Sequence, residues 1–277
     1  MSRLLVGFDS AWTVKNAGGL VGIVCQDEGD HQDLGPPVSA NFALAEEMIC
    51  EWQRVHVPSE TILLIDQPTI VNNRQGQRPV ENLVSSPVSL RYGGMQPAYT
   101  GRTGMFDLEA PIWSFLRCFG DAREPLSPTN RSIVFETYPV LAIIALGWTL
   151  PDQQRKERLP KYNPARRRTF HQNDWEHLCI KIIKEFQRAG LENIKGWIDS
   201  RRERKPTKGD QDCLDACLCL LVAMHIANGE PCLTVGQRES GEIVVPYSKS
   251  LEDELLARCI QTGRKPDEWL RRLPVCR

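Results

Sequence analysis

Two acidic residues, Asp212 and Asp215, stand at the start of an apolar segment and need a chemical explanation. Residues 213–227 are apolar on nearly every side, which predicts a buried helix. The two acids are three residues apart and therefore share one helix face. A buried carboxylate is destabilising unless it is paired, hydrogen-bonded or bound to a metal. Alternatively, Asp210 or Asp212 caps the helix and Asp215 interacts with the helix dipole in the first turn.

Three more acids lie in or directly after short apolar segments of strand length. Ligands bind at the ends of strands in open α/β sheets, so these acids are candidates for one site. An exposed acid at a strand end is also common, and this remains the alternative for Asp9. The three are Asp9 in segment 4–11, Asp66 in segment 61–68 and Glu136 in segment 133–139.

Carboxylates that converge in a protein core need a cation, because like charges at close range oppose each other's ionisation. Hard cations such as magnesium and manganese prefer oxygen ligands. Two such ions held by acids can activate water and stabilise the leaving oxygen of a phosphodiester. If the strand acids and the helix pair converge, the sequence therefore predicts a centre of two magnesium or manganese ions.

The other segments predict an α/β protein in which strands and helices together position these acids. Residues 4–11 and 19–25 flank turn-forming residues and predict an antiparallel hairpin. Residues 69–130 are too long for an ordinary connection, which predicts an inserted lid or loop region, helical near 111–119. The remaining expected elements are a strand at 38–42, helices at 43–55, 139–146, 175–188 and 251–259, and an edge strand at 241–246.

The composition limits the class of protein. The net charge of −1 excludes a uniformly basic nucleic-acid coat, although residues 155–168 and 201–208 are locally basic. Ten cysteines without regular spacing or a C-x-x-C pair argue against disulfides and a zinc ribbon. At the start of the chain the first acid comes after too short an apolar segment for a signal peptide. No apolar run reaches membrane-spanning length. These features predict a cytoplasmic protein with no membrane partner.

Several sequence motifs together resemble one known family. The sequence is similar to the domain-of-unknown-function family 429, described as predicted nucleases of the ribonuclease-H-like fold. That resemblance implies a mixed five-stranded sheet flanked by helices, with a long insertion after the fourth strand. It also implies a single domain over 1–277, with 69–130 as the insertion and 230–277 as a C-terminal extension. The motifs are Gly-Phe-Asp-Ser-Ala-Trp-Thr (7–13), Ile-Asp-Gln-Pro (65–68), Gly-Gln-Arg-Pro-Val-Glu (76–81), Phe-Glu-Thr-Tyr-Pro (135–139), Lys-Tyr-Asn-Pro-Ala-Arg-Arg (161–167), Asp-Cys-Leu-Asp-Ala (212–216) and Gly-Glu-Ile-Val-Val-Pro (241–246).

Residues 212–219 more distantly resemble a helix of RuvC-type Holliday junction resolvases. That resemblance implies Asp9, Asp66, Asp212 and Asp215 as the metal ligands. Glu136 belongs to the family pattern alone, where it completes the metal shell or orients Arg78 or Lys161. The family resemblance also implies a site wall whose basic groups hold phosphates, unless they pair among themselves. The wall residues are Ser10, Asn73, Arg78, Glu81, Tyr138, Lys161 and Arg167.

We therefore expect a metal-dependent nuclease that hydrolyses phosphodiester bonds of DNA or RNA by a two-metal-ion mechanism. A non-catalytic nucleic-acid or protein-binding module on the same fold is the first alternative. An ATP-handling enzyme of the actin and sugar-kinase type is the second, but it requires paired Asp-x-Gly-x-Thr loops. The segment that follows Asp9 matches such a loop poorly, and no second loop is visible. The sequence leaves open whether the protein is a homodimer.

Overall fold

The structure is a computed structural model that describes residues 2–10, 12–26, 30–85, 95–126, 131–154 and 156–273. Its centre is a mixed sheet in the order β3-β2-β1-β5-β6, with β4 also pairing with β2. The pairing of β1 with β2 is antiparallel, whereas β1–β5 and β5–β6 are parallel. The predicted α/β class and the predicted hairpin are thus confirmed. The strands are β1 (Arg3–Asp9), β2 (Gly18–Cys25), β3 (His31–Asp33), β4 (Val38–Ala40), β5 (Glu60–Ile65) and β6 (Ser132–Glu136).

The edge of the sheet beside β2 differs from the predicted five strands. Two short strands share this edge: β3 pairs with residues 23–25 of β2, and β4 pairs with residues 18–20. Pro36 and Pro37 lie between them, and proline cannot donate to a ladder, so the edge strand is interrupted. The sheet therefore has six strands at five positions, and Asp66 follows the fifth strand of the chain instead of the fourth.

Alternation along the strands sends side chains to two separate cores. Leu5 and Leu64 pack in the cluster that contains α7 (Lys208–Ala227). Val6 and Ile65, one residue further along their strands, pack in the cluster of α1 (Phe42–His56) and α3 (Pro111–Phe119). Since side chains two residues apart share a face, the α7 face of the sheet continues to Asp9 at the end of β1 and to Asp66 just beyond β5.

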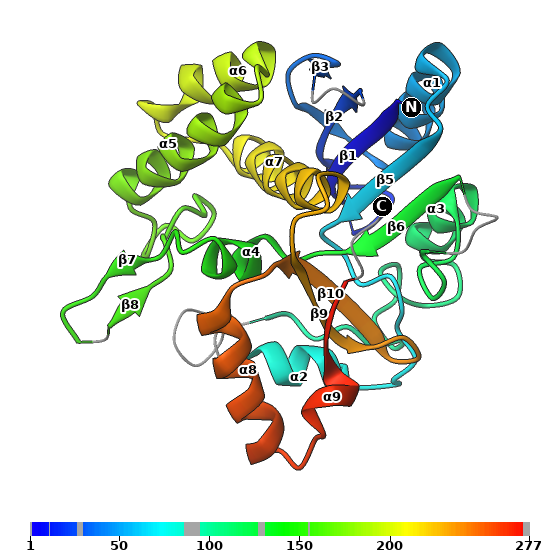
Figure 1. Cartoon of the computed structure of the whole chain (residues 1–277), viewed down its shortest axis with the longest axis vertical. Helices are drawn as coiled ribbons and strands as arrows, with labels where there is room; N and C mark the ends of the chain where they lie inside the picture. Colours follow the sequence, from blue (N-terminus) through cyan, green and yellow to red (C-terminus); the bar gives the residue numbers. More distant parts are fainter. Residues whose placement is uncertain are drawn as a thin grey trace.

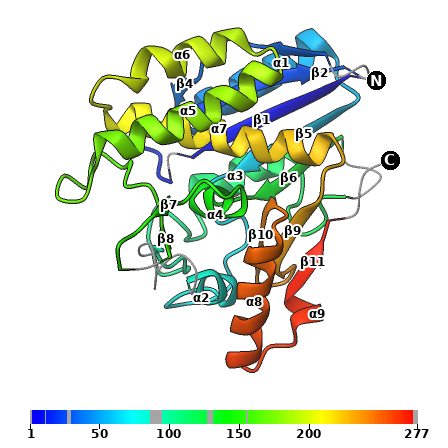
Figure 2. The ribbon, with the colours of Figure 1, turned by 60° about the vertical axis from the view of Figure 1, so that its left-hand side comes forward.

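Helices cover both faces of this sheet. Helix α7 crosses the face of β1 and β5, and α5 (Gln172–Arg188) and α6 (Glu192–Arg202) pack outside it (Figures 1 and 2). A capping box starts α7, in which Thr207 is the N-cap and Asp210 is the third helical residue. The N-cap is therefore Thr207, with Asp210 and not Asp212 as its capping-box partner, and Asp215 lies beyond the first turn of the helix. The predicted helices at 43–55 and 175–188 are confirmed as α1 and α5.

Two glycines allow α7 to lie directly on the strands. A Cβ at Gly7 in β1 would stand 2.1 Å from the Ala216 carbonyl oxygen, and one at Gly19 in β2 would stand 2.3 Å from the Asp212 carbonyl oxygen. Real side chains do not approach backbone atoms so closely. The acidic end of α7 consequently lies against the end of β1, where Asp9 is.

Parts of the predicted lid or loop region, residues 69–130, pack against the two sheets. Helix α3 matches the predicted 111–119 helix, but its side chains Phe115 and Phe119 are buried with α1 against the sheet. Helix α2 (Pro79–Ser85) packs instead on the C-terminal strands. Residues 86–94 and 127–130 of this region lie outside the described residues.

The C-terminal segment forms a second sheet beside the first. Its order is β10-β9-β11, so the predicted strand at 241–246 is an edge strand, but of this separate sheet. Thr137, just beyond β6, donates a 2.7 Å hydrogen bond to the carbonyl of Val244, which ties the two sheets together. The elements are β9 (Cys232–Gln237), β10 (Gly241–Pro246), α8 (Lys249–Gln261), α9 (Pro266–Trp269) and β11 (Leu270–Arg272).

The remaining elements are short. Helix α4 (Pro139–Ala145) confirms the helix predicted from residue 139, with proline in its first turn. Strands β7 (Leu150–Pro151) and β8 (Glu157–Arg158) form a small hairpin before α5. Within the described part of the chain, no helix combines the length and the apolarity needed to cross a membrane.

Candidate metal centre

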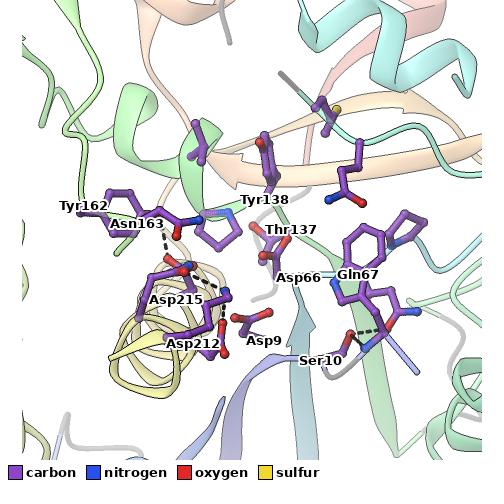
Figure 3. A pocket seen from close by; sticks show the side chains of 18 of the residues that line it. Asp9, Ser10, Asp66, Gln67, Thr137, Tyr138, Tyr162, Asn163, Asp212 and Asp215 are labelled. Carbon is purple, nitrogen blue, oxygen red and sulfur yellow. Dashed lines mark hydrogen bonds and ion pairs between the residues drawn. The ribbon is translucent and has the colours of Figure 1, made fainter. Parts of the chain in front are cut away.

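Three of the predicted acids meet where β1 and β5 end and α7 begins. Asp9 closes β1, Asp66 follows β5, and Asp215 lies on the second turn of α7. Each offers one carboxylate oxygen, and these three oxygens lie within 4.8 Å of one another. Figure 3 shows the three side chains pointing toward the same space. Asp9 and Asp215 are buried, and Asp66 is half-buried.

The pKa values reflect this crowding. Burial, followed by the charges of Asp66 and Asp215, raises the pKa of Asp9 well above its ordinary value. Burial and then Asp215 raise the pKa of Asp66 in the same way. Burial also raises the pKa of Asp215 to about 7, although the nearby Lys208 ammonium opposes the rise. Three converging carboxylates that resist ionisation are what a bound cation would stabilise, and their oxygens suit a hard divalent ion.

Two residues absent from the predicted site hold Asp215 in place. The Tyr162 hydroxyl donates a 2.8 Å hydrogen bond to Oδ1 of Asp215, and the Gln211 amide donates to Oδ2. Both side chains line the cleft that opens over the triad. Gln211 could have been found from the sequence, because it precedes Asp215 by one helical turn. Tyr162 lies in the family motif at 161–167, but only the tertiary structure brings that loop to α7.

Asp212 lies on the same side of α7 but outside the triad. Its carboxylate forms an ion pair with the Nζ of Lys208, one turn earlier. Lys208 also donates a 2.7 Å hydrogen bond to Oε1 of Gln211. The structure therefore brings together three of the four predicted metal ligands, and gives the fourth a lysine partner.

Glu136 lines the cleft over the triad but is not one of the three acids that make up the triad. It stands beside Ile65 in the parallel pairing of β5 and β6, and Ile65 faces α1 and α3, not α7. Its two oxygens accept 2.9 Å and 2.6 Å hydrogen bonds from the Arg78 guanidinium, and one accepts from the Thr69 amide. Of the two roles open for Glu136, the structure supports the orientation of Arg78.

Arg78 and Glu81, two of the predicted substrate contacts, form a buried ionic clamp with Glu136. The Nε of Arg78 donates a 2.7 Å hydrogen bond to Glu81, and its Nη1 donates to the Ile70 carbonyl. Glu81 also accepts from the Ala98 amide. Burial alone would lower the pKa of Arg78, but the two glutamates raise it. These contacts support the alternative left open for Arg78 and Glu81, in which they pair with other side chains instead of binding phosphate, and the donors of Arg78 hold the insertion to β6.

A cleft of about 1020 Å³ opens over the triad. Of the predicted wall residues, five line it: Ser10, Arg78, Glu81, Tyr138 and Lys161, of which Lys161 is exposed. The Ser10 hydroxyl donates to the side-chain oxygen of Gln67, which also lines the cleft. Burial and the charges of Asp66 and Asp215 raise the pKa of Tyr138, so its hydroxyl keeps its proton. These side chains surround the triad with hydrogen-bonding groups.

Two predicted wall residues do not line the cleft. Asn73 donates to the carbonyls of Gly76 and Ala98, both at 3.0 Å, and so stabilises the insertion loop. Arg167 is exposed and is not among the residues that line the cleft, whereas its neighbour Arg166 is. The path of the loop, which the motif does not specify, decides which of these adjacent arginines faces the site.

The fold and the site define an α/β protein with a buried acidic triad that can hold a metal ion. The chain belongs to the DUF429 family, described as proteins of unknown function, whose model matches residues 7–239. The predicted family is therefore confirmed. The chain matches no curated protein and no solved structure.

Proposed function

We propose that the protein is a divalent-metal-dependent nuclease that hydrolyses phosphodiester bonds of DNA or RNA. The observation that carries this proposal is the triad of Asp9, Asp66 and Asp215, whose oxygens lie within 4.8 Å of one another at the floor of a wide cleft. The arrangement of acids agrees with the family and resolvase resemblances for these three positions. Their convergence is more specific than any one acid alone.

The triad would hold magnesium or manganese, because its ligands are all carboxylate oxygens. When bound, such an ion supplies Lewis-acid chemistry, by lowering the pKa of a bound water and polarising a phosphoryl oxygen. The protein's own contribution is to fix the ligands. Tyr162 and Gln211 each donate to one oxygen of Asp215, and such supporting contacts orient metal ligands.

The rim of the cleft offers cations to a phosphate backbone. Lys15, Lys161 and Arg166 are exposed and line the cleft. They come from two segments far apart in the sequence, the β1–β2 turn and the loop before α5. Such contacts position a nucleic acid without reading its sequence. A cleft with acids at its floor and cations at its rim suits an anionic substrate whose phosphodiester bond reaches a metal.

The experiment is a cleavage assay with purified protein on single-stranded and structured DNA and RNA, with magnesium, manganese or EDTA. We expect cleavage only with a divalent cation, and its loss in Asp9→Asn and Asp215→Asn. Asp199→Asn, a surface acid paired with Arg202, is the matched control and should retain full activity.

Two results would contradict the proposal. One is cleavage that survives both triad substitutions or persists in EDTA. The other is nucleic-acid and metal binding without cleavage of any of the four substrates, which would support a binding module instead. ATP binding in the presence of magnesium, measured by calorimetry, would favour the ATP-handling class.

A further inference from the structure

Lys208 occupies an unusual position for a cation. Thr207 is the N-cap of α7, so Lys208 is the first helical residue. The N-terminus of a helix carries partial positive charge, which favours acids there and disfavours lysine. The acidic cluster one turn further on offsets this penalty, since the Lys208 ammonium pairs with Asp212 and hydrogen-bonds Gln211.

The influence of Lys208 reaches the whole cluster. Burial is the largest cause of the raised pKa of Asp9, of Asp66 and of Asp215. The Lys208 ammonium opposes this rise in all three. Lys208 also lines the cleft together with Asp212. A single side chain thus supplies positive charge to four carboxylates that lie at one end of α7 and the adjacent strand ends.

A second metal ion would need Asp212 as a ligand, as the resolvase resemblance implies. The carboxylate of Asp212 is instead engaged by Lys208, and Asp212 is not among the three acids whose oxygens lie within 4.8 Å of one another. A divalent ion beside Asp212 would meet the lysine ammonium at the same oxygen, and like charges at that distance repel. The residues present therefore fit one ion at the triad and do not fit a second at Asp212.

We propose that Lys208 takes the place of a second cation, so that the centre binds one divalent ion per chain. This inference rests on the metal-binding part of the proposed function and not on the identity of the substrate. The Lys208 ammonium, fixed by Asp212 and Gln211 at the edge of the cleft, supplies the second positive charge that faces the substrate.

The test counts bound manganese by isothermal titration calorimetry and by electron paramagnetic resonance, with no substrate present. The wild-type protein should bind one ion per chain. Lys208→Met removes the charge and keeps most of the side-chain volume, and it should bind two. Lys208→Met combined with Asp212→Asn should return to one, because the second ion loses its ligand. Lys208→Arg keeps the charge and should bind one ion, as the matched control.

The outcomes separate this inference from the proposed function. Two ions in the wild-type protein, or one ion in Lys208→Met with native circular dichroism, would overturn the role of Lys208 and leave the triad intact. No ion in the wild-type protein would overturn both. Should Lys208→Met not fold, Lys208→Gln replaces it, since the side chain is more than half exposed (54%) and glutamine is a good helix former.

Discussion

The hydroxyl of Tyr162 donates a 2.8 Å hydrogen bond to the carboxylate of Asp215, which lies 53 residues away in the sequence. Tyr162 is buried and comes from the loop before α5, whereas Asp215 belongs to α7. The contact fixes one oxygen of a triad acid while the Gln211 amide engages the other. The geometry of the candidate metal centre therefore depends on a loop that contributes no ligand itself.

Tyr162→Phe should weaken metal binding without unfolding the protein. Phenylalanine keeps the ring but removes the donor to Asp215, and loss of such a supporting contact lowers metal affinity by about 10- to 100-fold. Manganese titration by calorimetry measures the change. Tyr247→Phe is the control, because the Tyr247 hydroxyl bonds Glu252 in the C-terminal part of the chain. Equal affinities in both variants would contradict a role for Tyr162 at the centre.

Metal should stabilise the protein more at pH 8 than at pH 6. The pKa of Asp215 rises from its ordinary 3.8 to about 7 on burial. A carboxyl with a raised pKa stabilises the fold at low pH, and this contribution is lost as the pH rises through the folded-state value. Metal-free protein should therefore lose stability between about pH 4 and pH 8, and manganese should restore it. Melting temperatures with EDTA and with manganese test this, and a metal effect independent of pH would contradict it.

Arg78→Met should destabilise the fold by about 3–5 kcal/mol, because it leaves Glu81 and Glu136 buried without their partner. The loss should appear in urea unfolding in the absence of metal. Arg54→Met is the control: its pair with Glu51 lies on the surface of α1, and its removal should change stability little. If the urea midpoint of unfolding of Arg78→Met equalled that of the wild-type protein, the clamp would not stabilise the insertion.

Gly19→Ala should lower stability and metal affinity together. Its Cβ would meet the backbone of Asp212 and Cys213 in α7, within 2.6 Å, so the helix must shift away from β2. Overpacking of this kind is destabilising by about 1–3 kcal/mol. Gly196→Ala in α6 is the control, since a Cβ there meets no atom within 4 Å. Thermal unfolding and manganese titration of both variants measure the two effects. Unchanged metal affinity in Gly19→Ala would argue that the position of α7 on the sheet does not determine metal binding.

Arg166→Ala should weaken nucleic-acid binding, and Arg167→Ala should change it less. Arg166 lines the cleft and its neighbour does not. Loss of one phosphate contact lowers affinity about uniformly across sequences and reduces the salt slope by roughly 1. Fluorescence anisotropy over a range of salt concentrations measures both quantities. A larger effect from Arg167 than from Arg166 would move the substrate path out of the cleft.

The sequence alone determined the α/β class, the family and the five acids among which the triad is found. Apolar segments that end in acids specify strands and their ends, and the apolar run after residue 212 specifies a buried helix, because these signals depend on local periodicity. The separation of Glu136 from Asp9 and Asp66 depends in addition on the register of β6 against β5, which the sequence did not predict.

Only the tertiary structure decided which acids meet and which are paired with cations. Asp212 and Asp215 share a helix face, yet the contact of α7 with β1 at Gly7 places Asp215 beside the strand acids, and Lys208 engages Asp212. Tyr162 reaches Asp215 through a loop whose path no local pattern encodes. Local sequence fixes periodicity and charge, whereas the convergence of groups far apart in the chain depends on the packing of whole elements.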